Sequence, residues 1–90
     1  KPIREIKIGQ GGVAATAVDV KLIMKAAIEH LASAMIVFHN HPSGNLKPSA
    51  QDNALTIKIR EAAKLIDTRL NDHIIITDAS YYSYNDDGRL

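Results

Sequence analysis

Several kinds of residue are scarce in this sequence, and each absence excludes something. There is no cysteine, so the chain holds no disulfide bond, thiolate metal site or cysteine nucleophile. Aromatic residues make up only 4%, so the hydrophobic core must be mainly aliphatic. The longest apolar run, residues 34–38, is too short to span a bilayer, and no segment has the pattern of a signal peptide. We therefore expect no membrane partner and a cytoplasmic location.

An excess of charge of one sign is also missing. Eleven Lys and Arg residues face ten Asp and Glu residues, which gives a formal charge of +1. Domains that bind nucleic acid through charge alone usually carry a large basic excess, so nucleic acid is not an expected partner. The 90 residues, 46% hydrophobic and 23% charged, are typical of one soluble domain. Because the sequence begins at Lys1 rather than methionine, we expect this domain, residues 1–90, to be cut from a longer protein.

The first half of the chain contains three predicted elements. Residues 3–8 alternate in polarity like a half-buried strand, and residues 13–18 are small and β-branched like a second strand. A helix is predicted over residues 19–32, with Asp19 as its N-cap. Its apolar residues recur with helical spacing: Val20, Ile23, Met24, Ala27, Ile28 and Leu31.

The second half begins with the apolar run 34–38, which predicts a central strand covered on both faces. A turn-rich loop follows, and Ser49 is expected to cap a second helix. The apolar stripe of that helix consists of Leu55, Ile59, Ala62, Ala63 and Ile66. Three short strands are then predicted, over residues 68–70, 74–77 and 81–84, the last two as a hairpin. This order of elements predicts an α/β fold, a mixed sheet flanked by two helices.

Polar side chains gather where the apolar run ends. His39 and His41 point to the same side, because side chains alternate along a strand, and two neighbouring imidazoles suit a divalent metal. Asp52 shares one side of the second helix with Leu55 and Ile59, so its carboxylate faces inward. A buried carboxylate is costly unless something compensates its charge, and a metal does so. We therefore take Asp52 as the third ligand.

Two histidines and one aspartate leave a fourth tetrahedral position open, as in catalytic zinc sites, where zinc activates a water molecule. Nitrogen and oxygen ligands suit zinc without excluding iron, cobalt or manganese. Ser49 lies one turn before the aspartate, where its hydroxyl can donate to a developing oxyanion. No glutamate is equally well placed to act as a general base, since Glu5 is in the first strand and Glu29 on the solvent side of the first helix.

Each part of this pattern also has a simpler interpretation. The two histidines alone would be hydrogen-bonded residues at a strand end. Ser49-x-x-Asp52 alone is more often a helix cap, although a capping aspartate can also bind metal. His30 is predicted to be solvated, and His73 to be a structural hydrogen-bonding residue, with a supporting role beside the metal as the alternative.

The combined pattern is far more specific. His-x-His-Pro, followed after six residues by Ser-x-x-Asp, resembles the JAMM signature of the JAB/MPN metalloprotease superfamily. Residues 39–49, together with residues 72–76 and the hairpin at 81–83, resemble the bacterial RadC family over essentially the whole chain. The resemblance implies a single RadC-like JAB/MPN domain with a cytidine-deaminase-like architecture, forming the C-terminal part of a longer protein and lacking its N-terminal segment.

The resemblance also implies roles for individual residues. His39, His41 and Asp52 match the zinc ligands, and Ser49 matches the residue that stabilises the tetrahedral intermediate. The general base of the superfamily is a glutamate upstream of the segment with which this chain begins, so it is expected to be absent, and Glu5 is a poor substitute.

Two functions follow. The first is a JAMM-type, zinc-dependent metallohydrolase acting on a peptide or isopeptide bond through an activated water. The alternative is a non-catalytic binding module, associated with protein or DNA, that keeps a vestigial metal site. A glutamate beside the metal in the whole protein would distinguish them, whereas the DNA-repair name of the RadC family supports neither.

Overall fold

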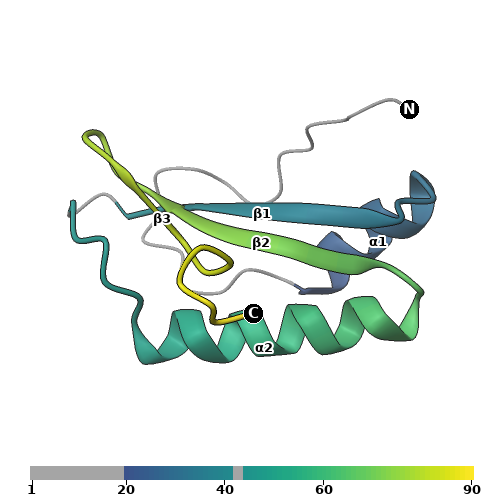
Figure 1. Cartoon of the computed structure of the whole chain (residues 1–90). Helices are drawn as coiled ribbons and strands as arrows, with labels where there is room; N and C mark the ends of the chain where they lie inside the picture. Colours follow the sequence, from purple (N-terminus) through teal and green to yellow (C-terminus); the bar gives the residue numbers. More distant parts are fainter. Residues whose placement is uncertain (1–19, 42–43) are drawn as a thin grey trace.

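The computed structural model describes residues 20–41 and 44–90 (Figure 1). The elements are helix α1 (Val20–Glu29), strand β1 (Ala34–Asn40), helix α2 (Ala50–Leu65), strand β2 (Arg69–Ile76) and strand β3 (Tyr81–Ser83). The strands predicted at 3–8 and 13–18, and the N-cap Asp19, lie outside the described residues. None of the described helices is long and apolar enough to cross a membrane.

The three strands form one mixed sheet in the order β1-β2-β3. β1 and β2 are parallel, and β3 turns back antiparallel to β2. Helix α2 connects the two parallel strands and runs along the sheet, as Figure 1 shows. The predicted α/β class, a mixed sheet with two helices, is therefore confirmed.

Both helices pack against the same face of the sheet. The centre of the core is formed by Ile23 of α1, Ile59 of α2 and Leu70 of β2, and Met35 and Val37 of β1 pack against it. Full burial of an aliphatic side chain, such as that of Ile59, stabilises the fold by roughly 1.5–3 kcal/mol. This core cluster is aliphatic, as the scarcity of aromatic residues predicted, although one aromatic side chain, Tyr84, is also buried.

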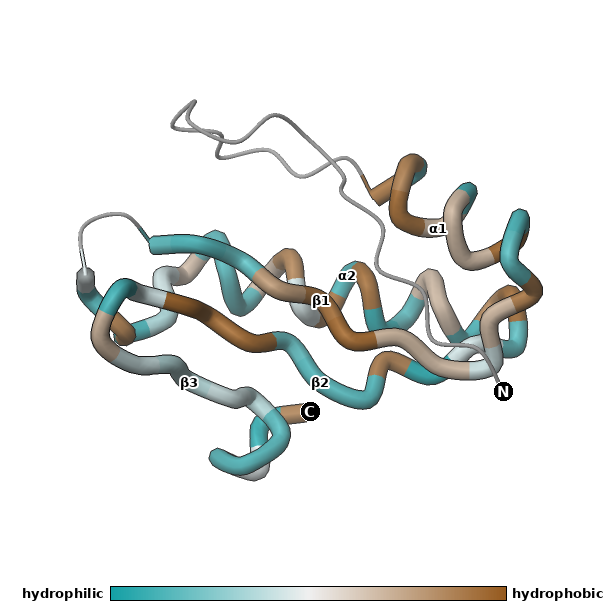
Figure 2. Tube along the Cα trace, turned by 90° about the horizontal axis from the view of Figure 1, so that it is seen from above, coloured by the Kyte–Doolittle hydropathy of each residue, from teal (hydrophilic) through white to brown (hydrophobic). Residues whose placement is uncertain are grey.

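The other face of β1 is open, so the predicted burial of this strand on both faces is wrong for the part of the chain that the structure describes. Ile36 and Phe38 are 50% and 58% exposed, and β1 is the edge strand of the order β1-β2-β3. Figure 2 shows the apolar stretch of β1 beside the polar middle of β2, while the apolar stretch of β2 lies beside the polar end of β1. A short apolar run cannot reveal whether one face or both faces of a strand are covered.

The strands predicted at 68–70 and 74–77 are one continuous strand, β2. The polar residues between the two apolar runs suggested a break, but they remain paired with β1. The pairing shifts where Met35 faces Leu70 and Ile36 faces Asp72, so Asn71 is the extra residue of a bulge. The predicted hairpin is confirmed, with β3 ending at Ser83.

The ends of the helices follow from local backbone geometry. α1 ends at Glu29, earlier than the predicted residue 32, because Leu31 adopts a left-handed conformation (φ 49°). The amide of Ala32 then bonds the carbonyl of Ala27 at 2.9 Å, which closes the helix. α2 begins directly after Ser49, as predicted.

Candidate metal centre

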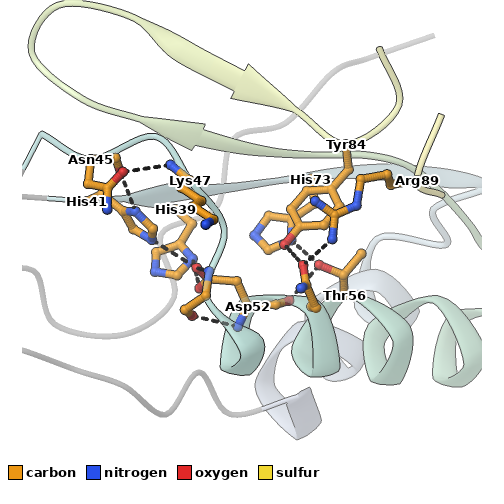
Figure 3. Close-up of polar contacts among 11 residues, drawn as sticks. His39, His41, Asn45, Lys47, Asp52, Thr56, His73, Tyr84 and Arg89 are labelled. Atoms are coloured by element: carbon orange, nitrogen blue, oxygen red, sulfur yellow. Dashed lines mark hydrogen bonds and ion pairs between the residues drawn. The ribbon is translucent and has the colours of Figure 1, made fainter. Parts of the chain in front are cut away.

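The three predicted ligands come from two elements that lie side by side. His39 is the penultimate residue of β1, and His41 follows the strand directly. The amide of His41 still donates to the carbonyl of Ile76 at 2.9 Å, so pairing with the sheet extends to this residue. Asp52 lies in the first turn of α2. Figure 3 shows both imidazoles directed toward the Asp52 carboxylate.

The ligand atoms are close enough to share one ion. His39 Nδ1 lies 3.3 Å from Asp52 Oδ1, and His41 Nε2 lies 3.2 Å from Asp52 Oδ2. Two ligand atoms bound tetrahedrally to one zinc at about 2.0–2.1 Å are about 3.3–3.4 Å apart, so these separations fit. One ligand atom from each of the three residues lies within 4.8 Å of the others. The predicted group is therefore brought together and could hold a metal ion.

The loop after β1 fixes the orientation of the second histidine. His41 Nδ1 lies 2.8 Å from the carbonyl oxygen of Asn45, which only accepts a hydrogen bond, so Nδ1 carries the proton. In the neutral imidazole the lone pair is then on Nε2, the atom that faces Asp52. Gly44 allows the tight turn, because its φ of 82° favours glycine and its amide donates to the His41 carbonyl at 3.0 Å.

The first histidine is held differently. His39 Nδ1 is buried, lies 3.3 Å from Asp52 Oδ1 and makes no hydrogen bond with any described group. Burial lowers the pKa of His39, and His41 lowers it further, while the carboxylate of Asp52 acts in the opposite direction. His39 is therefore neutral near pH 7, which is the protonation state that binds metal.

Asp52 is both a helix cap and the negative charge of the site. The amide of Ser49 donates to Asp52 Oδ2 at 2.7 Å, and the amide of Asp52 donates to Ser49 Oγ at 3.0 Å, so the two residues form a capping box. The side chain is only 5% exposed, as the inward position predicted. Burial acts to raise the pKa of Asp52, but the Ser49 hydrogen bonds and the two histidines outweigh it and lower that pKa.

Ser49 thus has its predicted capping role. Its hydroxyl oxygen accepts a hydrogen bond from the amide of Asp52. The capping box therefore does not use the hydroxyl hydrogen of Ser49. The further role, donation to an oxyanion, is untested and stays a prediction.

A second group of side chains, not predicted as a group, lies behind the ligands. His73 of β2 is fully buried, with its ring between those of His39 and Tyr84. Its Nδ1 lies 2.6 Å from Thr56 Oγ1, so the predicted hydrogen-bonding role of His73 is confirmed. Burial, reinforced by His39, lowers the pKa of His73 to about 4. The signal available in the sequence was spacing, since Thr56 lies one helical turn after Asp52.

Glutamate is not among the residues that contact the ligands in the described ranges. Glu29 pairs with Lys25, and Glu61 pairs with Arg60 and Lys64 on the exposed side of α2. Glu5 lies outside the described residues. His30, predicted to be solvated, is exposed.

The chain is similar to known proteins over nearly its whole length. The family model described as RadC-like JAB domain matches residues 1–89. A UPF0758 protein of Porphyromonas gingivalis is 52% identical over 84 residues, which are 92% of this chain and 37% of that protein. A UPF0758 protein of Flavobacterium johnsoniae is 44% identical over 88 residues, which are 98% of this chain and 38% of that protein.

The similarity covers nearly all of this chain but less than half of each relative. The chain spans less than two fifths of the length of these relatives, so they contain much that it does not cover. Within the chain, the matched region includes both segments that supply the metal-ligand group. On this evidence the chain belongs to the RadC family and corresponds to its RadC-like JAB domain.

Proposed function

We propose that this domain is a zinc-dependent hydrolase that cleaves a peptide or isopeptide bond in the cytoplasm. The observation that carries the proposal is the convergence of His39, His41 and Asp52, with nitrogen–oxygen separations of 3.3 and 3.2 Å that suit a tetrahedral ion. Two neutral imidazoles and one carboxylate leave a net charge of −1 to balance a divalent cation. Three protein ligands leave a coordination position for substrate or water, as in catalytic sites.

Different residues of the chain would hold the metal ligands and stabilise the oxyanion in such a site. When bound, zinc supplies a Lewis acid and makes hydroxide available near neutral pH. His41 is held in the ligating tautomer by Asn45, and Asp52 is held by the capping box. Ser49, exposed at the start of α2, can donate its hydroxyl hydrogen to the oxyanion of a tetrahedral intermediate.

One observation favours the alternative, a binding module that keeps the metal without catalysis. Hydrolysis needs a general base, and neither Glu29 nor Glu61 contacts the metal ligands. Under the alternative the ion would stabilise the domain, while the surface around it would bind a protein or a nucleic acid. Both functions require the metal, and they are distinguished by whether the domain cleaves a substrate.

The test measures zinc content and cleavage in the whole protein. We expect about one zinc per chain in the wild type, loss of zinc in His39→Ala, and no loss in His30→Ala, a matched change of an exposed histidine. Cleavage of a mixed peptide library, followed by mass spectrometry, should disappear in the presence of a chelator and in His39→Ala. Zinc retained with no cleavage would favour the binding module, and no zinc in the wild type would contradict both functions.

A further inference from the structure

Three flat side chains form a stack that ends on a metal ligand. The ring of His39 is nearly parallel to that of His73, at 8° and with centroids 5.8 Å apart, and His73 is nearly parallel to Tyr84, at 5° and 4.9 Å. Figure 3 shows His73 between the ligand histidines and Tyr84. One side of His73 therefore faces a ligand, and its other side is backed by a tyrosine that is 1% exposed.

The same histidine is connected to the other ligand segment through Thr56. The Thr56 hydroxyl has one hydrogen, which it donates to the backbone carbonyl of Asp52 at 2.8 Å. The 2.6 Å contact with His73 is therefore donated by His73 Nδ1–H and accepted by Thr56 Oγ1. Two short hydrogen bonds thus join β2 to the turn of α2 that carries Asp52.

The other ring nitrogen of His73, Nε2, shows that placing a histidine here costs free energy of folding. Nε2 then carries a lone pair, and it is buried with no partner among the described residues. A buried acceptor without a partner costs about 1–3 kcal/mol. Phenylalanine would fill the same space without that cost, but it would lack the Nδ1–H donor. A histidine here is explained by a need for both a flat ring and that donor.

We propose that His73 is a positioning residue of the metal centre. Its ring fixes the plane of His39, and its bond to Thr56 fixes the distance between α2 and β2, the strand that is paired with β1, so the ligands converge before metal arrives. The physical basis is general, since groups that orient metal ligands commonly change metal affinity 10–100-fold when they are removed. This inference rests on the proposed function, because it presumes that His39, His41 and Asp52 bind a metal.

The test measures zinc affinity in the whole protein by competition with a chromophoric chelator, together with the visible spectrum of the cobalt(II) form. His73→Phe keeps the ring and removes the donor, and Thr56→Val removes the hydroxyl at nearly constant size. We expect each variant to bind zinc roughly 10–100-fold more weakly than wild type and to change the cobalt spectrum, which reports ligand geometry. The double variant should bind zinc with nearly the same affinity as the single variant that binds it more weakly, because both changes break the same hydrogen bond.

A matched control separates positioning from stability. Thr77→Val removes hydroxyl hydrogen bonds in the turn between β2 and β3, so it should lower the melting temperature and leave zinc affinity and the cobalt spectrum unchanged. If His73→Phe does not fold, Thr56→Val decides the question alone. Wild-type affinity and spectrum in Thr56→Val would overturn the positioning role while leaving the proposed function intact. A wild type that binds no zinc would overturn both.

Discussion

At the scale of single residues, Asp52 shows how one side chain can serve the fold and the site together. Its Oδ2 atom accepts a hydrogen bond from the Ser49 amide and so completes the cap of α2, while Oδ1 and Oδ2 lie 3.3 and 3.2 Å from the nitrogens of His39 and His41. The side chain needs both contacts, because a carboxylate that is 5% exposed must be compensated. The helix cap thus positions a carboxylate that could bind a metal ion.

The change Asp52→Asn separates these two functions. Asparagine keeps the size and can still cap, so the metal-free free energy of unfolding should change by only about 1 kcal/mol. Zinc affinity should fall by roughly 100-fold or more, since removal of a ligand charge exceeds the usual effect of removing a group that only orients a ligand. Calorimetric titration with zinc measures the affinity. Asp78→Asn, in an exposed turn, should have neither effect, and an unchanged affinity in Asp52→Asn would exclude this carboxylate as a ligand.

Acid should destabilise the metal-free protein through His73. Burial lowers the pKa of His73 from its ordinary value of 6.5 to about 4 in the folded state, so the unfolded chain binds the extra proton first as the pH falls. The contribution of His73 to stability is therefore present near pH 7 and is lost as the pH falls from about 6.5 to about 4. Between pH 7 and pH 5 this amounts to about 2 kcal/mol. Urea unfolding at both pH values, with chelator present, should show this loss in the wild type and a smaller loss in His73→Phe. Equal losses would contradict the assignment.

At the scale of elements, the sequence patterns predicted best where the local chemistry is self-contained. The start of α2 was predictable because Ser49 and Asp52 form their capping box within four residues. The end of α1 was not, because Leu31 adopts a left-handed conformation that its residue type disfavours. The continuity of β2 was hidden for a different reason, since the polar residues before Ile74 are satisfied by long-range contacts.

Those contacts centre on Asp72, which the sequence placed between two apparent strands. Its carboxylate accepts the amides of His73 and Asn85 at 2.8 and 3.0 Å and the hydroxyl of Ser83 at 2.5 Å. The aspartate thereby ties β2 to the end of β3, and no local pattern of apolar residues could reveal partners eleven and thirteen positions away.

The start of α2 gives a test that distinguishes capping from catalysis. Ser49→Ala should destabilise the fold by about 1 kcal/mol through loss of the N-cap. Ser49→Asp should restore stability, because aspartate is an equally good cap, but it supplies no hydroxyl hydrogen for an oxyanion. Urea unfolding measures the first effect and peptide cleavage the second. Cleavage restored in Ser49→Asp would show that Ser49 only caps, and Ser33→Ala, another exposed serine, serves as the control.

At the scale of the whole molecule, the site depends on a topology that the sequence could only suggest. The order of elements predicted the α/β class, and the alternation in β1 placed His39 and His41 on one side. Their meeting with Asp52 required the parallel pairing of β1 with β2 and the packing of α2 against the core through Ile59. The spacing of Thr56 indicated that it lies on the same side of α2 as Asp52. Its contact with His73 and the stacking of Tyr84 on that ring could not be predicted, because both depend on the packing of side chains from distant segments.

Zinc should stabilise the domain, because its ligands come from two elements that separate on unfolding. At a free zinc concentration of about 100 times Kd, the free energy of unfolding should rise by about 2.7 kcal/mol. For a domain of this size, that corresponds to an increase in melting temperature of roughly 10–20 °C. Thermal scans with zinc and with chelator measure the difference. Magnesium at the same concentration is the control, since it prefers six oxygen ligands, and equal melting temperatures with zinc and with chelator would argue against the site.

We expect His39, His41 and Asp52 to bind one cation together. The most direct measurement is anomalous diffraction at the zinc edge from crystals of the whole protein soaked in zinc. We expect one strong peak about 2.0–2.2 Å from a nitrogen of each histidine and from a carboxylate oxygen of Asp52. A map without a peak between these residues, with the imidazoles turned away from the carboxylate, would contradict this expectation.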